Sequence, residues 1–524
     1  MGIVSPSLIY RLEQAYRKES QYFFHEKTEV RNRKGGNMER NNYLFFTGDG
    51  YDYLEGHLKA IYGERGDFHW NVQRFLAGEV YQARCHRADQ LDDLPEITPD
   101  QIKGIVAREQ HFKDTVNNIC EKYDEIIKDK KTLTDDDALY LAGLMGLAPG
   151  VCDWMDTLFP NLVDLFVSCE EEAEKIRCAV NDNKKIVHMI VAEMLDGMRG
   201  GQIIQVGGRD VFSQGYARNF YRGENAYNKT SKPSMFRKRP ANEEEAELQD
   251  LISFLAIYDF VLWLKDLYCT THWPFGHIHA IAIAQHYGIP TFTVDITSDF
   301  KVALFFACCK YDWEQQKWRP LQKSEFEQPD SRADVAARGG DSRYGVLFST
   351  PADVEHMSFY SGHKVSNRGM IEPIGYQPFM RCPRQSAYIL TANYAYDVFQ
   401  DSTFAKVKFR HTEELCQWIY DEMDGGAKIY PEEGKMNCEH IAARFRSSKV
   451  FSDAAWKLCM EQQKIPEAKA GELKAKLEQR GYSFAEKVEW CTQDELDAIN
   501  NEWKSLDYLT KNEVTPKFRF GFCI

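Results

Sequence analysis

The sequence lacks the long apolar runs, Cys-x-x-Cys pairs and glycine-rich phosphate loops that identify several common classes of protein. No window approaches the ~20 apolar residues that a membrane-spanning helix needs. The N-terminal segment has no long apolar core and soon becomes charged, so we expect neither a signal peptide nor an anchor. The fourteen cysteines are scattered without a Cys-x-x-Cys pair, which argues against zinc and against a disulfide framework. We therefore expect a cytoplasmic protein with reduced cysteines, no membrane contact and no metal.

Positive charge is also in deficit. The chain has 65 Lys and Arg against 79 Asp and Glu, which gives a formal net charge of -14. This balance argues against a surface that binds nucleic acid throughout, and it leaves a local basic groove open. The hydrophobic content of 43% and charged content of 27% match an ordinary globular protein. A chain of 524 residues is long enough for about two to four domains.

Hydrophobic periodicity divides the chain into three parts. Residues 1–200 form a mainly helical N-terminal domain, since segments such as 101–129 carry apolar residues at three- and four-residue steps. Paired glycines and short β-rich runs begin at residue 201, with helical patterns between them but no strict alternation. This mixture of strand and helix patterns predicts an α+β domain over 201–435. Residues 436–524 return to helical patterns and form a helical C-terminal region.

The first candidate for chemistry is Arg222, which follows an apolar-aromatic run and precedes Gly223. An arginine at such a strand end can hold a carboxylate or phosphate through two parallel hydrogen bonds. The stretch "KPSMFRKR", residues 232–239, then adds basic side chains around a Pro-Ser turn. The structural alternative is a salt bridge at Arg222 and a solvated basic face.

The second candidate is "AQHYGIPTFTVDITSDFKVALFFA", residues 284–307. Gly288 is expected to end a helix, and the β-branched run after it predicts a short strand. Asp295, Thr297 and Ser298 then fall at the strand end, before a helix N-terminus that suits a phosphate or a hydroxyl-rich ligand. The alternative reading gives Ser298 or Asp299 a capping role and Asp295 a turn-bonding role.

The third candidate is "YQPFMRCPRQSAYIL", residues 376–390, in which Arg381, Arg384 and Gln385 lead into an apolar strand. The alternative is an ordinary strand entrance with solvated arginines. This segment becomes a candidate for a functional site because it follows the other two candidates in the chain.

Together these segments resemble the FRG domain, a family named for an initial Phe/Tyr-Arg-Gly motif. The chain supplies "YRGE", "KPSMFR", the long central segment, "PRQSAYIL" and "KIYPEE" in the family's order, over residues 218–435. The resemblance includes His286 and Tyr287, which can line a pocket or cap a helix end. Tyr227 can stack on a nicotinamide ring or belong to the core.

The same order is similar to the ADP-ribosyltransferase arrangement of the arginine, serine, glutamate type. That similarity implies a mixed-sheet core that takes NAD as its substrate. By position, Arg222 would hold the pyrophosphate side, and Thr297 with Ser298 would line the nicotinamide ribose. Gln385 or Ala387 would fall near the place of the glutamate that stabilises the ribosyl cation.

No acidic residue stands at that strand entrance. Either Glu224, Asp295 or Glu372 supplies the carboxylate, or the site binds NAD without efficient transfer. The predicted catalytic residues are Arg222, Ser298, Gln385 and Glu224, and the predicted NAD-binding residues are Arg222, Gly223, Tyr227, His286, Tyr287, Asp295, Thr297 and Arg384.

Two functions follow from the resemblance. The first is an NAD-dependent ADP-ribosyltransferase-like effector, of the bacterial toxin or phage-defence type, that modifies a protein or nucleic acid. The helical flanks would then recognise the target, an antitoxin or a regulatory partner. The second is a non-catalytic module in which the FRG core senses a nucleotide or mediates a protein interaction.

Overall fold

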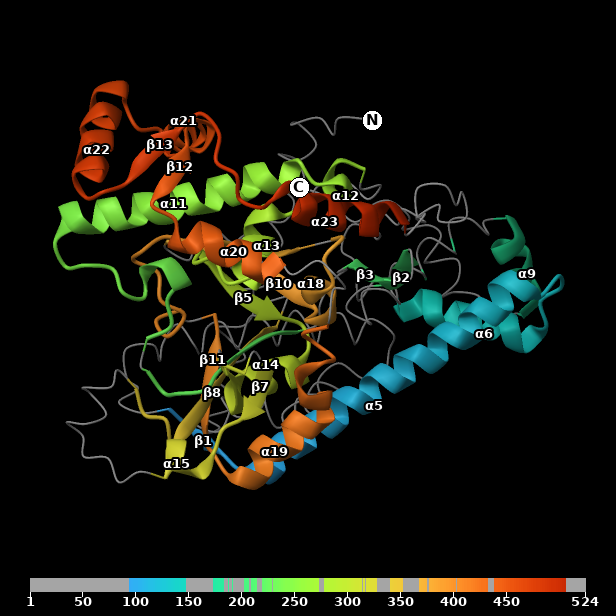
Figure 1. Ribbon diagram of the computed structural model, residues 1–524. Helices are drawn as coiled ribbons and strands as arrows, with labels where there is room; N and C mark the ends of the chain where they lie inside the picture. The colour runs from blue at the N-terminus through green and yellow to red at the C-terminus, as the bar shows by residue number, and fades with distance from the viewer. Residues whose placement is uncertain are drawn as a thin grey trace, which may run out of the picture.

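A computed structural model gives the fold of most of the chain beyond residue 93. The described residues are 94–147, 173–182, 187, 191, 202–206, 209–213, 219–228, 230–272, 278–312, 314–315, 317–327, 340–351, 367–374, 377–401, 403–431 and 438–505. Residues 1–93, the first part of the predicted N-terminal helical domain, lie outside them. The described part combines helices with a seven-stranded mixed sheet, which confirms the predicted α+β class (Figure 1).

The central sheet has the strand order β1-β11-β8-β4-β5-β10-β9. Its strands are β1 (Glu96–Ile97), β4 (Asn219–Glu224), β5 (Thr293–Thr297), β8 (Tyr344–Pro351), β9 (Arg368–Pro373), β10 (Ala387–Ala392) and β11 (Ala405–Arg410). β1 pairs in parallel with β11, and every other neighbouring pair in this sheet is antiparallel. Three two-stranded sheets accompany it: β2 (Gln202–Val206) with β3 (Arg209–Ser213), β6 (Cys309–Asp312) with β7 (Lys317–Pro320), and β12 (Val450–Ser452) with β13 (Ser483–Ala485).

Helices cover the sheet and extend from it. They are α5 (Pro99–Asp124), α6 (Asp135–Leu147), α9 (Ala173–Asp182), α11 (Glu243–Lys265), α12 (Tyr268–Thr271), α13 (Ala280–His286), α14 (Phe300–Cys308), α15 (Lys323–Phe326), α18 (Arg381–Arg384), α19 (Glu413–Glu422), α20 (Cys438–Ser447), α21 (Asp453–Gln462), α22 (Glu467–Gln479) and α23 (Gln493–Ser505). α5 runs from the sheet out to α6 and α9, and α11 lies across the opposite end of the molecule (Figure 1). Across the described residues, none of the helices is long and apolar enough to cross a bilayer.

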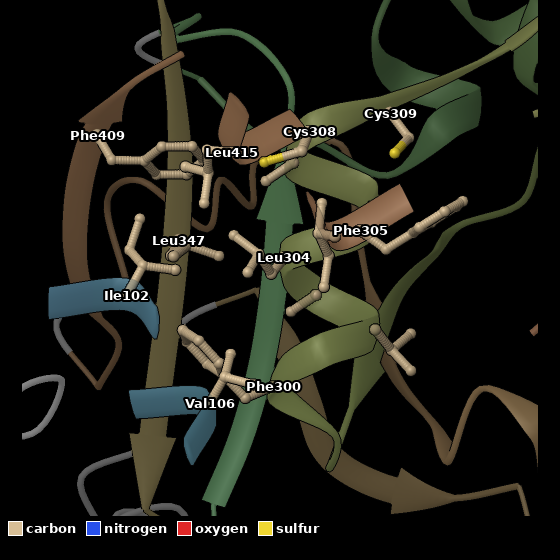
Figure 2. Close-up of a cluster of buried hydrophobic side chains, with 14 of the residues drawn as sticks. Ile102, Val106, Phe300, Leu304, Phe305, Cys308, Cys309, Leu347, Phe409 and Leu415 are labelled. Atoms are coloured by element: carbon tan, nitrogen blue, oxygen red, sulfur yellow. The ribbon is translucent and has the colours of Figure 1, made fainter. Parts of the chain in front are cut away.

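The first core cluster lies between α14 and the strands β4, β8 and β11. Figure 2 shows Phe300 and Leu304 of α14 facing Leu347 of β8, with Ile102 and Val106 of α5 closing the side. All five side chains are at most 5% exposed. Because β1 and α5 precede residue 201, part of the N-terminal segment belongs to the same core as the sheet.

A second cluster packs α11, α13, α20 and α23 against β10, where Ala387 and Ile389 point toward the helices. The opposite face of the sheet carries Phe220, Val294 and Ile296, which pack with the segment that follows β10. Neighbouring strand residues therefore point to opposite faces, as the two-residue period of a strand requires.

The two helices beside β5 begin and end for local reasons. Gly288 has φ of +88°, a conformation that glycine adopts without strain, and it follows α13 as the sequence predicted. Asp299 caps α14, since its carboxylate accepts a hydrogen bond from the Lys301 backbone N–H at 2.8 Å. Lys113 of α5 lies 2.6 Å from the other oxygen of Asp299. This helix N-terminus, expected to attract a phosphate, therefore already faces a carboxylate of the chain itself.

Asp259 joins α11 to the C-terminal helices. The residue is 2% exposed, and its carboxylate accepts hydrogen bonds from the backbone N–H of Ser452 at 3.1 Å and from the hydroxyl at 2.5 Å. Ser452 is the N-cap of α21, so the contact fixes the start of α21 on α11. Burial raises the pKa of Asp259 to about 6, although the hydrogen bonds from Ser452 lower it in part.

Stability should therefore depend on pH through Asp259. Because its folded pKa lies above the ordinary value of 3.8, folding favours the protonated acid. This stabilisation is present below about pH 4 and is lost as the pH rises through about 6. We expect the free energy of unfolding to fall by about 3 kcal/mol across that window, and Asp259→Asn to remove this fall. Urea unfolding of the wild type and of Asp259→Asn at about pH 4 and pH 7 measures this change in the free energy of unfolding. An equal fall in both proteins would show that Asp259 is not its source.

Candidate functional site

A cavity of about 660 Å³ opens beside β4 and β5. The two strands share one residue pair, Tyr221 with Thr297, whereas β5 pairs with β10 over five residues. The residues just beyond that single pair on both strands line the cavity, so the opening lies where β4 and β5 part. The lining residues are Tyr221, Arg222, Gly223, Glu224, Asn225, Asn228, Thr230, Ser231, Lys232, Arg237, His286, Asp295, Ile296, Thr297, Val302, Ala303, Phe306, Cys309, Lys310, Tyr311, Trp318, Gln385 and Ala387.

Arg222 bridges the gap between the parted strands. Its Nη1 donates to the main-chain oxygen of Asp295 at 2.9 Å, and its Nη2 lies 3.1 Å from Glu224 Oε1. Its Nε also faces Ser231 Oγ at 3.3 Å. The side chains of Arg222 and Glu224 are only 10% and 12% exposed. The guanidinium therefore replaces strand-to-strand contacts that the sheet lacks here.

Gly223 allows β4 to pack directly on α14. A Cβ atom at this position would lie 1.8 Å from the Ala303 main-chain oxygen and 2.7 Å from its carbon. The obstacle is helix backbone, which cannot move aside as a flexible side chain does. This close approach explains why a glycine follows Arg222.

Replacing Gly223 with alanine is expected to lower the free energy of unfolding by about 1–3 kcal/mol, because α14 must shift away from β4. A matched control is Gly471→Ala on α22, where an added Cβ meets nothing within 4 Å. Alanine there should stabilise the helix by about 0.5–1 kcal/mol. Urea unfolding of both variants checks the two signs. A neutral Gly223→Ala would show that the strand and helix can separate without cost.

Four buried polar atoms of the cavity-lining residues have no hydrogen-bond partner among the described residues. They are Glu224 Oε2, Asp295 Oδ1, His286 Nε2 and Trp318 Nε1. Leaving such an atom unpaired costs about 1–3 kcal/mol, so native proteins pair them with water or a ligand. Water or a polar ligand can supply the missing partners of these four atoms.

The Asp295 carboxylate is held in one orientation by Gln285 of α13. Gln285 Nε2 donates to Asp295 Oδ2 at 3.1 Å. Its amide oxygen accepts from the Thr291 hydroxyl at 2.6 Å and from the Ser234 hydroxyl at 3.0 Å. Because the amide can donate only through nitrogen, these bonds fix which side faces Asp295. They leave Oδ1 as the carboxylate oxygen without a hydrogen-bond partner among the described residues.

Three of the family segments meet beside the cavity: the central segment 284–307, the segment 376–390 and "KIYPEE". Arg381 stacks on Tyr430 of "KIYPEE", with its guanidinium carbon 3.6 Å from the ring centroid, and donates to the main-chain oxygen of His286 at 3.2 Å. Gln385 donates to the Ile429 main-chain oxygen at 3.0 Å. The family order along the chain therefore becomes a set of contacts in space.

Burial lowers the pKa of the His286 imidazole, and the nearby Asp295 carboxylate and a hydrogen bond with Gln385 oppose this shift only in part. The ring is therefore neutral at neutral pH, and its free Nε2 can either accept or donate a hydrogen bond.

One wall of the cavity is aromatic. Phe306, Tyr311 and Trp318 come together at the β6–β7 hairpin, with the Trp318 ring centroid 5.5 Å from Phe306 and 5.4 Å from Tyr311. Flat, apolar surfaces of this kind suit a planar ring. Trp318 Nε1 adds a hydrogen-bond donor at the same place.

Seven of the predicted site residues line the cavity: Arg222, Gly223, Glu224, His286, Asp295, Thr297 and Gln385. Thr297 donates its hydroxyl to the Gln385 main-chain oxygen at 2.7 Å, which ties two of them together. Among the lining residues, the acidic side chains are those of Glu224 and Asp295. Glu372, the third candidate carboxylate, is exposed on β9 and does not line the cavity.

The other four predicted residues do not line the cavity. Ser298 hydrogen-bonds the buried Tyr388 hydroxyl, and Tyr227 packs beside Phe399 at 5.9 Å. Tyr287 is buried under Arg381, whose guanidinium carbon lies 4.4 Å from the ring centroid. Arg384 is exposed.

Sequence reasoning missed Ser231, Gln285 and Trp318. Ser231 sits just before the basic stretch and Gln285 just before His286, so both had a motif beside them. Trp318 lies in a segment without any motif, and only the β6–β7 pairing brings it to the cavity. Within the described residues, no group of three or more His, Cys, Asp or Glu side chains can hold a metal ion.

Residues 217–316 match the family model of the FRG domain, so the chain contains an FRG domain, as its motifs predicted. Every cavity-lining residue except Trp318, Gln385 and Ala387 falls within the matched segment. No curated protein and no solved structure matches the chain.

Proposed function

We propose that the cavity of this FRG-domain protein binds a nucleotide of the NAD type and that the protein transfers the ADP-ribosyl group to a macromolecule. The observation that carries the proposal is the pair of cavity carboxylates, Glu224 and Asp295, each with one buried oxygen that lacks a partner among the described residues. Carboxylate oxygens accept hydrogen bonds from ribose hydroxyls and stabilise positive charge that develops on the sugar.

The remaining lining suits the other parts of such a ligand. The aromatic wall of Phe306, Tyr311 and Trp318 offers a surface for a nicotinamide or adenine ring. Lys232, Arg237 and Lys310 bring positive charge to the same cavity. A volume of about 660 Å³ lies in the range of small-molecule and cofactor sites.

Glu224 is the carboxylate proposed to act in catalysis. Breaking the bond between the ribose C1′ and nicotinamide leaves the electron pair on nicotinamide and an oxocarbenium-like sugar, which an adjacent carboxylate stabilises. A hydroxyl or amine of the target then bonds to C1′, and its proton passes to Asp295. Gln385, which the sequence similarity puts near the glutamate position of the ADP-ribosyltransferases, then contributes a main-chain hydrogen bond to Thr297 and an amide hydrogen bond to Ile429.

A second function is non-catalytic nucleotide sensing. The observation that favours it is the Arg222–Glu224 ion pair at 3.1 Å, which already offsets the charge of the proposed catalytic carboxylate. For either function we also propose a toxin or phage-defence role and a cytoplasmic location. The helical flanks would then bind an antitoxin, a regulatory protein or the target.

The test is incubation of the purified protein with NAD labelled in its adenylate phosphate, alone and with cell lysate. Nicotinamide release and label on protein or nucleic acid are measured, and NAD binding is measured by calorimetry. Release with transferred label supports the transferase; binding without release supports the sensor. Absence of NAD binding would overturn both functions. Glu372→Gln, which changes a carboxylate outside the cavity, is the control that should behave as wild type.

A further inference from the structure

The cavity contains two arginines whose bonding differs sharply. Arg222, the residue expected to hold the pyrophosphate, is 10% exposed and already bonds Glu224, Ser231 and the main chain of Asp295. A phosphate that bound it in a fork would compete for the guanidinium with Glu224, its ion-pair partner. Removing that partner from a mostly buried charge is costly. Arg222 is thus a structural bridge between the strands.

Arg237 is exposed to solvent and lines the same cavity. Its Nε donates to the Lys232 main-chain oxygen at 3.2 Å, which orients the guanidinium. Its two terminal nitrogens make no hydrogen bond or ion pair with the described residues. A guanidinium fixed through Nε keeps four N–H groups for an anion, in the fork geometry that fits phosphate.

The turn that carries Arg237 is firmly held. Met235 and Phe236 are 3% and 7% exposed. The Met235 N–H donates to the Thr291 main-chain oxygen at 3.1 Å, and the Thr291 N–H donates to the Ser234 hydroxyl at 2.9 Å. The backbone is therefore tied to the segment before β5, while the Arg237 side chain extends into the cavity.

The charges around Arg237 also favour an anion. Crowding by the cavity walls lowers the pKa of its guanidinium, and the nearby positive charge of Arg222 lowers it further, while Glu224 and Asp295 act in the opposite direction. An arginine keeps its proton through such shifts. A phosphate beside Arg237 would relieve the repulsion between the two guanidinium groups.

Its two basic neighbours are placed differently. Arg239 is paired with Asp250 at 3.0 Å and with Glu243 at 3.0 Å, and Lys238 is exposed. Neither lines the cavity. Lys238 therefore offers a matched control one residue away from Arg237.

We propose that Arg237, rather than Arg222, binds the phosphate groups of the nucleotide, so that the pyrophosphate enters at the turn Ser234–Phe236 and the sugar lies between Glu224 and Asp295. This inference rests on the proposed function for the identity of the nucleotide. The anion site itself is defined by Arg237 and is testable without NAD chemistry.

The test compares wild type, Arg237→Ala and Lys238→Ala by calorimetry with three probes: inorganic pyrophosphate, ADP-ribose, and nicotinamide riboside, which has no phosphate. Loss of one forked arginine–phosphate contact should weaken ADP-ribose and pyrophosphate binding by about tenfold or more in Arg237→Ala. Nicotinamide riboside binding should change less than about twofold, and Lys238→Ala should match wild type for every probe. Thermal unfolding of each variant verifies that the fold is kept.

The outcomes separate this inference from the proposed function. If Arg237→Ala binds ADP-ribose as tightly as wild type while wild type splits NAD, the function stands and Arg237 is not the phosphate residue. If pyrophosphate and ADP-ribose bind through Arg237 while NAD is neither bound nor split, the anion site stands and the function fails. If wild type binds neither anionic probe, the anion site is wrong.

Discussion

Replacing Glu224 with glutamine is expected to lower the rate of nicotinamide release from NAD by about 100- to 1,000-fold. Removing one group that stabilises a transition-state charge typically costs about 3–4 kcal/mol. Glu224 Oε2 is buried without a partner among the described residues, and Asp295 is the other cavity carboxylate. The amide has the size of the acid but carries no charge, so it cannot offset the developing oxocarbenium ion. Single-turnover release of nicotinamide is the measurement.

Two controls separate chemistry from folding and binding. The amide oxygen can still accept from Arg222 and Ser231, as Glu224 Oε1 does in the native protein, so thermal unfolding should show a folded variant. ADP-ribose binding should weaken far less than the rate. Glu372→Gln, at an exposed position of β9, should keep the wild-type rate. If Glu224→Gln releases nicotinamide at the wild-type rate, Glu224 is not the catalytic carboxylate.

Replacing Asp401 with alanine is expected to lower the free energy of unfolding by about 3–5 kcal/mol. Asp401 pairs with Arg368 at 2.7 Å, and neither side chain is exposed at all. It also accepts from the Tyr396 hydroxyl at 2.8 Å and from Thr403 through both its backbone N–H at 2.9 Å and its hydroxyl at 2.7 Å. Removing the carboxylate leaves a buried guanidinium without its counter-charge, which explains the size of the loss.

Urea unfolding of the Asp401 variant gives the measurement, with Glu414→Ala as its comparison. Glu414 pairs with Lys103 at a similar 2.7 Å, but its side chain is 81% exposed. Because water screens an exposed pair of this kind, Glu414→Ala should lower the free energy of unfolding far less than Asp401→Ala does. Equal losses in the two variants would mean that burial does not set the value of these ion pairs.

Much of the segment around β5 could be predicted because its signals are local. Val294 and Ile296 alternate with Asp295 and Thr297, which is the pattern of a strand with two different faces. Gly288 marks the end of α13 because its positive φ suits glycine. The placement of seven predicted residues around one cavity followed from the order of the motifs.

The parting of β4 from β5 could not be predicted, since no residue of either strand signals where their pairing stops. The ion pair between Arg222 and Glu224 could not be predicted either. The two residues lie on one face of β4, but the sequence does not say whether they bond each other or other partners. β1 pairs with β11 across most of the chain, Glu96 with Lys408, and such long-range pairings leave little trace in a single sequence. Ser298 lies one residue beyond the end of β5 and hydrogen-bonds the Tyr388 hydroxyl instead of lining the cavity.

The single residue pair that joins β4 to β5 bears on how the matched segment 217–316 behaves by itself. Of the seven strands of the central sheet, this segment contributes only β4 and β5. β5 is otherwise held by β10, and β4 by β8, both of which lie outside it. Cut out as a fragment, the family segment would keep most of the cavity-lining residues and lose the neighbours that hold its two strands in place. The FRG match therefore covers most of the cavity lining, while the central sheet that holds its strands in place includes strands from β1 to β11.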